Sequence, residues 1–289
     1  MDGLIRRPLP GPQQRRCVVI STQLVASGPG QNRTADTRFR KPLLYPLSYG
    51  AASNRVYELA FSMPTAMHRL PPRSSAGRIA LVGAVLLGLG LCVAIFIALD
   101  LAAANARDLP VNTWFWDLGQ KQGWVLALAQ FFSWFADGPR NIVIAPLVAV
   151  ILVLARWWRW AVFLLVSSQL GLVISNILKF SIARERPPFI ENTDLQQHLS
   201  FPSGHAFAGF TIWAAMAIIA WYQLRPPWAN VVTILLLVIG LLQAPSRLIV
   251  GKHWVTDVLG SWLVGAGWLL LVWAAFLWWL ALRPVEERV

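Results

Sequence analysis

The sequence is short of charged residues, which make up only 13% of its 289 residues, whereas hydrophobic residues make up 56%. A soluble domain of this size carries about a quarter charged residues. This shortage excludes an ordinary soluble enzyme. Together with 16 tryptophans and a positive mean hydropathy, it indicates a protein that is embedded in a membrane.

Cysteine is scarce as well. The chain has only Cys17 and Cys92, which lie far apart, and Cys92 falls inside an apolar run. Neither a disulfide framework nor a zinc site is therefore indicated. The sequence also has no internal repeat and no phosphate-binding nucleotide fingerprint, so we expect no nucleotide cofactor.

Acidic residues are too few to balance the basic ones, and the net charge of +12 is unevenly spread. Residues 1–77 hold 11 basic and only 3 acidic side chains, scattered among Pro, Gly and Ser. We interpret this segment as disordered. A basic arm can bind nucleic acid, but no nucleic-acid-binding fold is recognisable, so we expect no such partner. A cytoplasmic flank held near anionic lipid headgroups is the simpler interpretation.

The start of the chain has a second peculiarity. Residues 31–38 and 42–49 resemble peptides that arise when a transfer-RNA gene is wrongly translated. We therefore hypothesise an over-extended gene start, with the true start at Met63 or Met67. A genuine disordered tail and an Arg-rich transit peptide are the alternatives. A native protein whose intact mass begins at residue 1 would contradict the hypothesis.

Residues 78–282 follow the pattern of a membrane protein with several helical spans, and we expect an all-α bundle of six transmembrane helices with a cytoplasmic tail at 283–289. The polar stretch 101–123 is a candidate interfacial helix, and the apolar stretch 124–136 is short. The expected spans are Ile79–Leu99, Asn141–Ala155, Trp160–Leu178, His205–Leu224, Trp228–Ala244 and Val255–Leu282.

The distribution of basic residues predicts the orientation, because cytoplasmic loops carry an excess of Lys and Arg. With six spans, one side of the membrane receives Arg69, Arg73, Arg78, Arg156, Arg159, Arg225, Arg283 and Arg288. That side is interpreted as cytoplasmic. We expect the protein in a cell membrane, specifically a bacterial plasma membrane.

Two loops on the opposite side break this charge rule. Ionisable groups at membrane ends are costly and by default suggest a functional site. Three cations, Lys179, Arg186 and Arg247, can form a socket for a phosphate dianion. Ser203 can cap the helix that follows it, and Gly204 lets phosphate oxygens approach the free amides of that helix start.

The same loops hold two histidines. His253 and Asp257 are four residues apart at the start of the sixth span, so they share one helical face. A carboxylate there can keep one ring nitrogen protonated and leave the other free to attack phosphorus. His205 can protonate the departing oxygen. This set of groups needs no metal.

Each of these residues also has an ordinary explanation. Lys179 and Arg186 could simply extend toward the headgroups from helix ends. Asp257 could have no role beyond pairing with Arg247. Arg184 could add charge at the phosphate or pair with Glu185. Chance does not explain the whole set at its spacing on one side of the membrane.

The residues also resemble the motifs of the type 2 phosphatidic acid phosphatase (PAP2) superfamily, which includes bacterial acid phosphatases and vanadium haloperoxidases. The first motif, Lys, six residues, Arg-Pro, matches residues 179–187, and the second, Pro-Ser-Gly-His, matches residues 202–205. The third, Ser-Arg, five residues, His, three residues, Asp, matches residues 246–257. All eleven specified positions are present in the right order.

The resemblance implies a membrane-bound lipid phosphatase that forms a phosphohistidine on His253, with His205 as general acid and base and the site on the extracytoplasmic face. Phosphatidic acid, phosphatidylglycerol phosphate and undecaprenyl diphosphate all offer a terminal phosphate. A phosphotransferase is an alternative, and so is a non-catalytic binder or transporter of lipid phosphates. The long apolar spans argue against a haloperoxidase. The motifs do not predict an oligomeric state.

Overall fold

The computed structural model describes residues 70–135, 137, 139–190 and 199–281. Regular structure in these ranges is helical, apart from an isolated β-bridge between Glu185 and Leu199. The all-α prediction is therefore confirmed. Most of the segment expected to be disordered, and the tail after residue 282, lie outside the described residues.

Five helical segments are long and apolar enough to cross a membrane. They are α2 (Ala76–Leu99, after the 3-10 turn η2, Arg73–Ser75), α6 with η3 and α7 (Trp158–Leu165, Val166–Leu170, Gly171–Ile182), α9 with η4 and α10 (Gly204–Ala208, Gly209–Ala214, Ala215–Gln223), α11 (Trp228–Ile249) and α12 (Val255–Ala281). The prediction of a polytopic membrane fold is confirmed by these segments.

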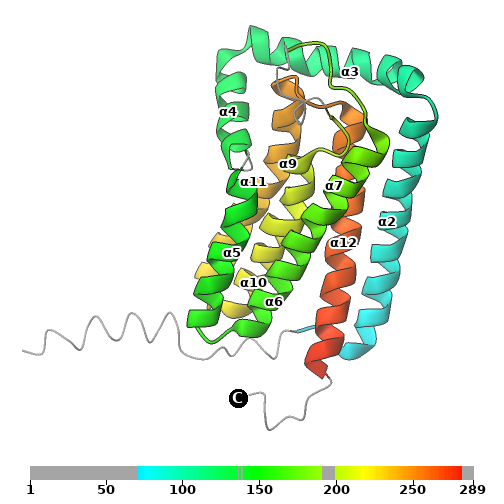
Figure 1. Cartoon of the computed structure of the whole chain (residues 1–289). Coiled ribbons are helices and arrows are strands. Elements are labelled where there is room, and N and C mark those ends of the chain that lie inside the picture. The colour runs from blue at the N-terminus through cyan, green and yellow to red at the C-terminus, as the bar shows by residue number, and fades with distance from the viewer. Residues whose placement is uncertain (1–69, 136, 138, 191–198, 282–289) are drawn as a thin grey trace, which may run out of the picture. The chain divides into compact units, whose positions relative to one another are not determined.

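The second expected span, residues 141–155, corresponds to α5 (Pro139–Leu154), and the short apolar stretch 124–136 forms the separate helix α4 (Gly123–Trp134). Neither helix reaches the length of the other five segments. Figure 1 shows α5 following α4 down one side of the bundle, so that the pair connects its two ends. The count of six single-helix spans therefore stays a prediction.

Helix α3 (Leu101–Lys121) is the candidate interfacial helix, and it lies across one end of the bundle (Figure 1). It begins where the side chain of Asp100 accepts a hydrogen bond from the amide of Ala103 at 2.9 Å. This N-cap satisfies one of the amide groups that the first turn of a helix leaves without a partner. The chain therefore turns sharply from α2 into α3.

Two span ends differ from the expectation and bear on the site. The fifth span was expected to end at Ala244, but α11 continues through Pro245 to Ile249 and takes Ser246 and Arg247 into its last turn. The third was expected to end before Lys179, but α7 runs to Ile182. Hydropathy detects the apolar part of a helix, whereas backbone hydrogen bonds continue into its polar end.

The core of the bundle lies largely toward the end opposite α3. Trp160, Phe163, Trp273 and Phe276 are buried, and the rings of Trp160 and Phe276 are 4.8 Å apart between centroids. Elsewhere the helices cross closely. A Cβ atom on Gly209 would lie 2.4 Å from the carbonyl oxygen of Gly240, so this crossing requires glycine.

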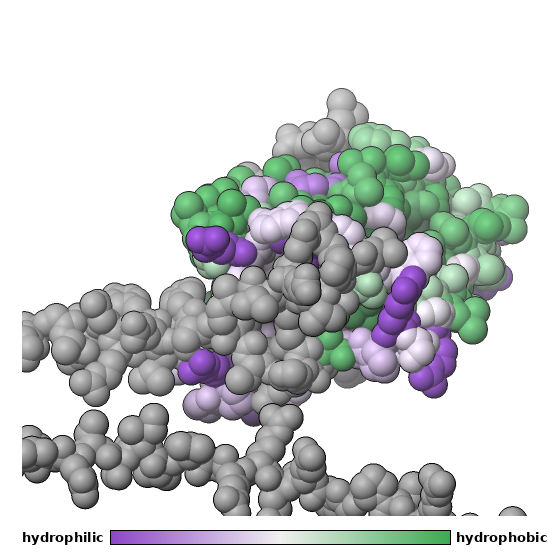
Figure 2. Space-filling model, turned by 90° about the horizontal axis from the view of Figure 1, so that it is seen from below, coloured by the Kyte–Doolittle hydropathy of each residue, from purple (hydrophilic) through white to green (hydrophobic). Residues whose placement is uncertain are grey.

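The outside of the bundle is apolar. Leu81, Val150, Ile177 and Ile234, from four different helices, are each more than half exposed. Such a surface is unusual in water and fits contact with lipid chains. Figure 2, which looks at the end opposite α3, shows apolar residues over much of the periphery and hydrophilic residues in separate patches.

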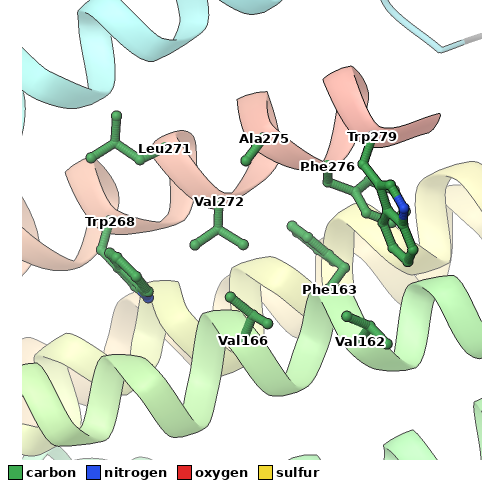
Figure 3. Close-up of a pocket in the computed structure, with 9 residues that line it drawn as sticks. All are labelled: Val162, Phe163, Val166, Trp268, Leu271, Val272, Ala275, Phe276 and Trp279. Atoms are coloured by element: carbon green, nitrogen blue, oxygen red, sulfur yellow. The ribbon is translucent and has the colours of Figure 1, made fainter. Parts of the chain in front are cut away.

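A cavity of about 340 Å³ lies between α6, η3 and α12 (Figure 3). Its lining residues are all hydrophobic and include Val162, Val166, Trp268 and Trp279. It lies along the later part of α12, beyond the first turn that carries Asp257. None of the motif residues lines it, so it is not the phosphate site.

Candidate active site

The three motif segments meet at the end of the bundle that α3 covers (Figure 1). Lys179 lies in the last turn of α7, Ser203 is the N-cap of α9, and Arg247 lies in the last turn of α11. Asp257 lies in the first turn of α12. Helix ends from three separate parts of the sequence therefore lie close together at this end of the bundle.

The three expected phosphate-binding cations are held by neutral groups. Lys179 donates to the carbonyl of Leu199 at 3.1 Å, and Arg186 donates to the carbonyl of Lys252 at 2.9 Å. Arg247 donates to the hydroxyl of Ser133 at 2.5 Å. Within the described residues, none of the three cations forms an ion pair, so their charges are not neutralised.

Two of these guanidinium groups also retain a donor. The Nε atoms of Arg186 and Arg247 are buried and have no hydrogen-bond partner in the described part of the chain. Burial lowers the pKa of Arg186, and the charge of Asp257 partly opposes this effect. Buried donors without partners are rare in folded proteins. An oxyanion bound between these two side chains would satisfy both.

The helix start at Ser203 is built as the sequence predicts. The hydroxyl of Ser203 accepts from the amide of Ala206 at 3.5 Å, and its own amide donates to the hydroxyl of Ser261 at 2.7 Å. A Cβ atom on Gly204 would meet no atom within 4 Å. The glycine is therefore not required by packing within the chain, and its open side can admit a ligand to the helix start.

His253 lies in the turn between α11 and α12 rather than on α12 itself, and it is 2% exposed. Its pKa is held well below the ordinary value of 6.5, mainly by burial and then by the charges of Arg186, Arg247 and Lys179. A histidine with a lowered pKa is neutral at pH 7 and keeps a lone pair for attack. The same three cations that can bind phosphate thus act on the imidazole.

This lowered pKa predicts the pH dependence of the reaction. Protonation of His253 removes its lone pair, so activity is lost only as the pH falls through the lowered pKa. We expect the acid limb of kcat/KM to lie below pH 6.5. The limb is measured with a lipid phosphate and with its phosphorothioate analogue, because the substrate also titrates. A limb at or above pH 6.5 with both substrates would contradict the prediction.

Asp257 is close to His253, but the contact is longer than a hydrogen bond. Oδ2 of Asp257 lies 3.6 Å from Nδ1 of His253, and Nδ1 has no hydrogen-bond partner among the described residues. Oδ2 accepts instead from the amide of Trp254 at 2.8 Å and from the hydroxyl of Ser200. Catalytic hydrogen bonds are often long before a substrate binds.

His205 and Arg247 share a partner on α4. The Nε2 atom of His205 lies 3.0 Å from the carbonyl oxygen of Ser133, whose hydroxyl accepts from Arg247. A carbonyl oxygen can only accept, so Nε2 carries a proton. Ser133 was not among the predicted site residues. It lies in an apolar stretch of the sequence, where a single serine gives no signal of a function.

Arg184 behaves differently from both expectations for it. It is fully buried and does not pair with Glu185, and all of its guanidinium nitrogens are bonded to protein side chains. Ion pairs of 2.9 Å and 2.8 Å join it to Asp108 and to Asp257. Asp257 therefore pairs with Arg184 and not with Arg247. Four of its five guanidinium N–H donors are thus bonded to protein side chains, so Arg184 is held by these partners and is not open to phosphate.

Metal binding is not indicated by the described residues. No group of three or more His, Cys, Asp or Glu side chains in those ranges is placed to hold a metal ion. The reaction without a metal stays a prediction that the chelator experiment below tests.

Comparison with known proteins gives the family. The model of the PAP2 superfamily matches residues 160–281, which include all three motifs. Over 154 residues the chain is 30% identical to the "Putative undecaprenyl-diphosphatase YbjG" of Escherichia coli strain K12, covering 49% of this chain and 69% of that protein. It is also 29% identical to an undecaprenyl-diphosphatase of Sulfolobus acidocaldarius, covering 48% of this chain and 63% of that protein.

A solved structure has the same fold. It is the transmembrane PAP2-type phosphatidylglycerolphosphate phosphatase of Bacillus subtilis, with a TM-score of 0.57 and 20% identity. The match covers 70% of this chain and 98% of that one. At this identity the likeness establishes the fold, and the sequence matches establish the family. The chain therefore belongs to the PAP2 superfamily.

Proposed function

We propose that this phosphatase removes the terminal phosphate of a membrane lipid through a phosphohistidine on His253. The observation that carries the proposal is the surplus of positive charge around a neutral imidazole. Lys179, Arg186 and Arg247 all act on His253, and two of them retain a buried N–H donor. A phosphate dianion supplies the missing charge and accepts from both donors.

In the first step, a ring nitrogen of His253 attacks phosphorus, and the bond between phosphorus and the lipid oxygen breaks. Nδ1 faces Asp257, so Nε2 is the nitrogen that attacks. The lipid oxygen leaves with the bonding electrons and takes a proton from His205. The cations stabilise the charge that spreads over the remaining phosphate oxygens in the transition state.

In the second step, water attacks phosphorus and the bond to His253 breaks. His205 now accepts the proton of the water molecule, which returns it to its protonated form. Inorganic phosphate leaves, and His253 is neutral again. The two steps together consume one water molecule and return every residue to its starting state.

The substrate that we place first is a polyprenyl diphosphate. The two relatives compared by sequence are named undecaprenyl-diphosphatases, whereas the solved structure is named for phosphatidylglycerolphosphate. The motif residues contact the terminal phosphate and do not distinguish the lipids. Since the described loops and helix ends opposite the site carry Arg156, Arg159 and Arg225 and no acidic residue, we also propose that the site faces away from the cytoplasm.

A panel of lipid phosphates tests this function. Purified protein in vesicles is given undecaprenyl diphosphate, phosphatidic acid or phosphatidylglycerol phosphate, with and without a metal chelator, and phosphate release is measured. We expect release that the chelator does not reduce, from substrate in the leaflet on the α3 side. Separate vesicle preparations of each protein orientation identify that leaflet.

The alternatives give different results in the same panel. Binding without release from any lipid would favour a binder or transporter. Release that requires a second lipid alcohol, with the phosphate found on that alcohol, would favour a phosphotransferase. Activity lost with chelator and restored by a metal would contradict the metal-free mechanism.

A further inference from the structure

Helix α3 turns a polar face toward the site. Asn105, Asp108 and Asn112 are spaced by three and four residues, so they lie on one side of the helix. Asp108 is 3% exposed and Asn112 is fully buried, whereas Trp114 on another side is 60% exposed. A helix lying at a membrane surface usually buries its apolar side in the bilayer and leaves its polar side to water. The buried polar face of α3 therefore needs an explanation.

The first part of this face reaches Asp257 through Arg184. Asp108 accepts from Nη2 of Arg184 at 2.9 Å, and Asn105 accepts from Nε at 2.8 Å. Nη1 then donates to Oδ1 of Asp257 at 2.8 Å. Arg184 is thus fixed on one side by α3 and on the other by the carboxylate. With Oδ1 held in this way, the second oxygen of Asp257 is the one directed at Nδ1 of His253.

The second part of the face holds the backbone beside the nucleophile. The amide nitrogen of Asn112 donates to the carbonyl of His253 at 2.7 Å, and its oxygen accepts from the amide of Val255 at 3.0 Å. Asp108 also accepts from the hydroxyl of Thr256 at 2.5 Å. Side chains of α3 therefore hold the backbone of His253, before Trp254, and that of Val255, after it.

Stability alone does not explain this arrangement. A buried ion pair often contributes little net stability, because both groups lose their hydration. Apolar side chains could attach a surface helix at lower cost. The contacts instead converge on two groups, the carboxylate and the backbone of the nucleophile, whose positions decide whether the imidazole points at phosphorus.

We propose that Asp108 and Asn112 of α3 are positioning residues, which aim His253 and Asp257 at the phosphate through Arg184 and through the backbone of residues 253–256. This inference rests on the proposed phosphohistidine mechanism. In the described part of the chain, neither residue forms a hydrogen bond or ion pair with Lys179, Arg186 or Arg247, which would bind the phosphate. According to the proposal, one set of residues orients His253 and another set binds the phosphate.

Two isosteric substitutions test the proposal. Asp108→Asn removes the ion pair with Arg184, and Asn112→Asp places a carboxylate oxygen against the carbonyl of His253. Each has a matched control away from the site, Asp117→Asn at a half-exposed position on the same helix and Asn230→Asp at an exposed position on α11. The measurements are kcat and KM for the lipid phosphate, inhibition by inorganic phosphate and by orthovanadate, and thermal unfolding.

We expect kcat to fall roughly 10- to 100-fold in both test variants, because small displacements of a reacting group have effects of this size. KM and inhibition by inorganic phosphate should stay unchanged, since the cations are untouched. Orthovanadate can take the imidazole as an axial ligand and so imitates the transition state. Its inhibition should weaken by about the factor by which kcat falls. The two control variants should behave as the unmodified protein.

Several outcomes would overturn the inference. One is unchanged kcat in folded variants. Another is that inhibition by phosphate and inhibition by vanadate weaken by the same factor in the variants. A third is loss of folded protein in both variants, which would mean a structural role only. If the unmodified protein releases no phosphate from any lipid, the proposed function fails first and the inference fails with it. Turnover by the unmodified protein thus distinguishes the two failures.

Discussion

Replacing His253 by alanine is expected to abolish phosphate release while the protein still folds and inserts into the membrane. The imidazole supplies the bond-forming nitrogen, and no other described histidine takes its place beside Asp257. Loss of a covalent nucleophile lowers kcat by at least about 10⁴-fold. The measurement is phosphate release from a lipid substrate in vesicles, with direct binding of inorganic phosphate measured alongside. That binding should persist, because the three cations remain.

The covalent intermediate gives a direct test of the same residue. Unmodified protein quenched in alkali after a short exposure to ³²P-labelled substrate should carry label that acid releases, as expected for a phosphorus–nitrogen bond. The His253→Ala protein should carry none. Exogenous imidazole, diffusing into the space that the substitution leaves, should restore part of the turnover. An active His253→Ala enzyme would end the phosphohistidine mechanism.

Replacing His205 by glutamine is expected to slow the reaction by an amount that depends on the leaving group. Glutamine can still donate to the carbonyl of Ser133, which His205 contacts through Nε2 at 3.0 Å, but it cannot transfer a proton. Loss of a general acid or base typically costs 10²- to 10⁴-fold. We expect a loss in this range for a lipid phosphate monoester, whose alkoxide leaves poorly without a proton.

A good leaving group separates the two roles of His205. With p-nitrophenyl phosphate the first step needs no acid, so the phosphoenzyme should form quickly in the His205→Gln protein. The second step still lacks its base, and the phosphoenzyme should therefore accumulate. Rapid-quench measurement of bound label gives this result. Equal losses with both substrates and no accumulation would show that His205 does not transfer protons in either step.

The same pair of measurements bears on the natural substrate. In a diphosphate the departing group is a lipid monophosphate, which leaves far more easily than an alcohol. The His205→Gln protein should thus lose less activity toward undecaprenyl diphosphate than toward phosphatidic acid. This difference comes from the chemistry of the departing oxygen and is independent of how each lipid tail binds.

The sequence by itself determined the helical class, the membrane location and the motif residues of the candidate site. These conclusions depend on local properties. An apolar run long enough to cross a bilayer can be identified within a single short segment of the chain. Lys179, His205 and His253 each belong to a motif whose spacing is defined within its own segment. Such signals do not require knowledge of which segments touch.

Only the tertiary structure decided what surrounds those residues. Asn112 contacts His253 across 141 positions of the sequence, and Arg184 reaches Asp108 across 76. No local pattern selects those partners, because a contact of this kind exists only after the helices have packed. Arg184 is an example, since its neighbour in sequence, Glu185, was a plausible partner and the folded chain supplied Asp108 and Asp257 instead.

The extension of α11 beyond the expected end of its span has a related cause. Helix ends depend on whether backbone groups find partners, and hydropathy does not report this. Ser246 and Arg247 are polar, yet their backbone continues the helix beyond Pro245. The sequence thus identifies which side chains can carry the chemistry. Their orientation depends on contacts between helices that are distant in the sequence, because those contacts form only when the bundle packs.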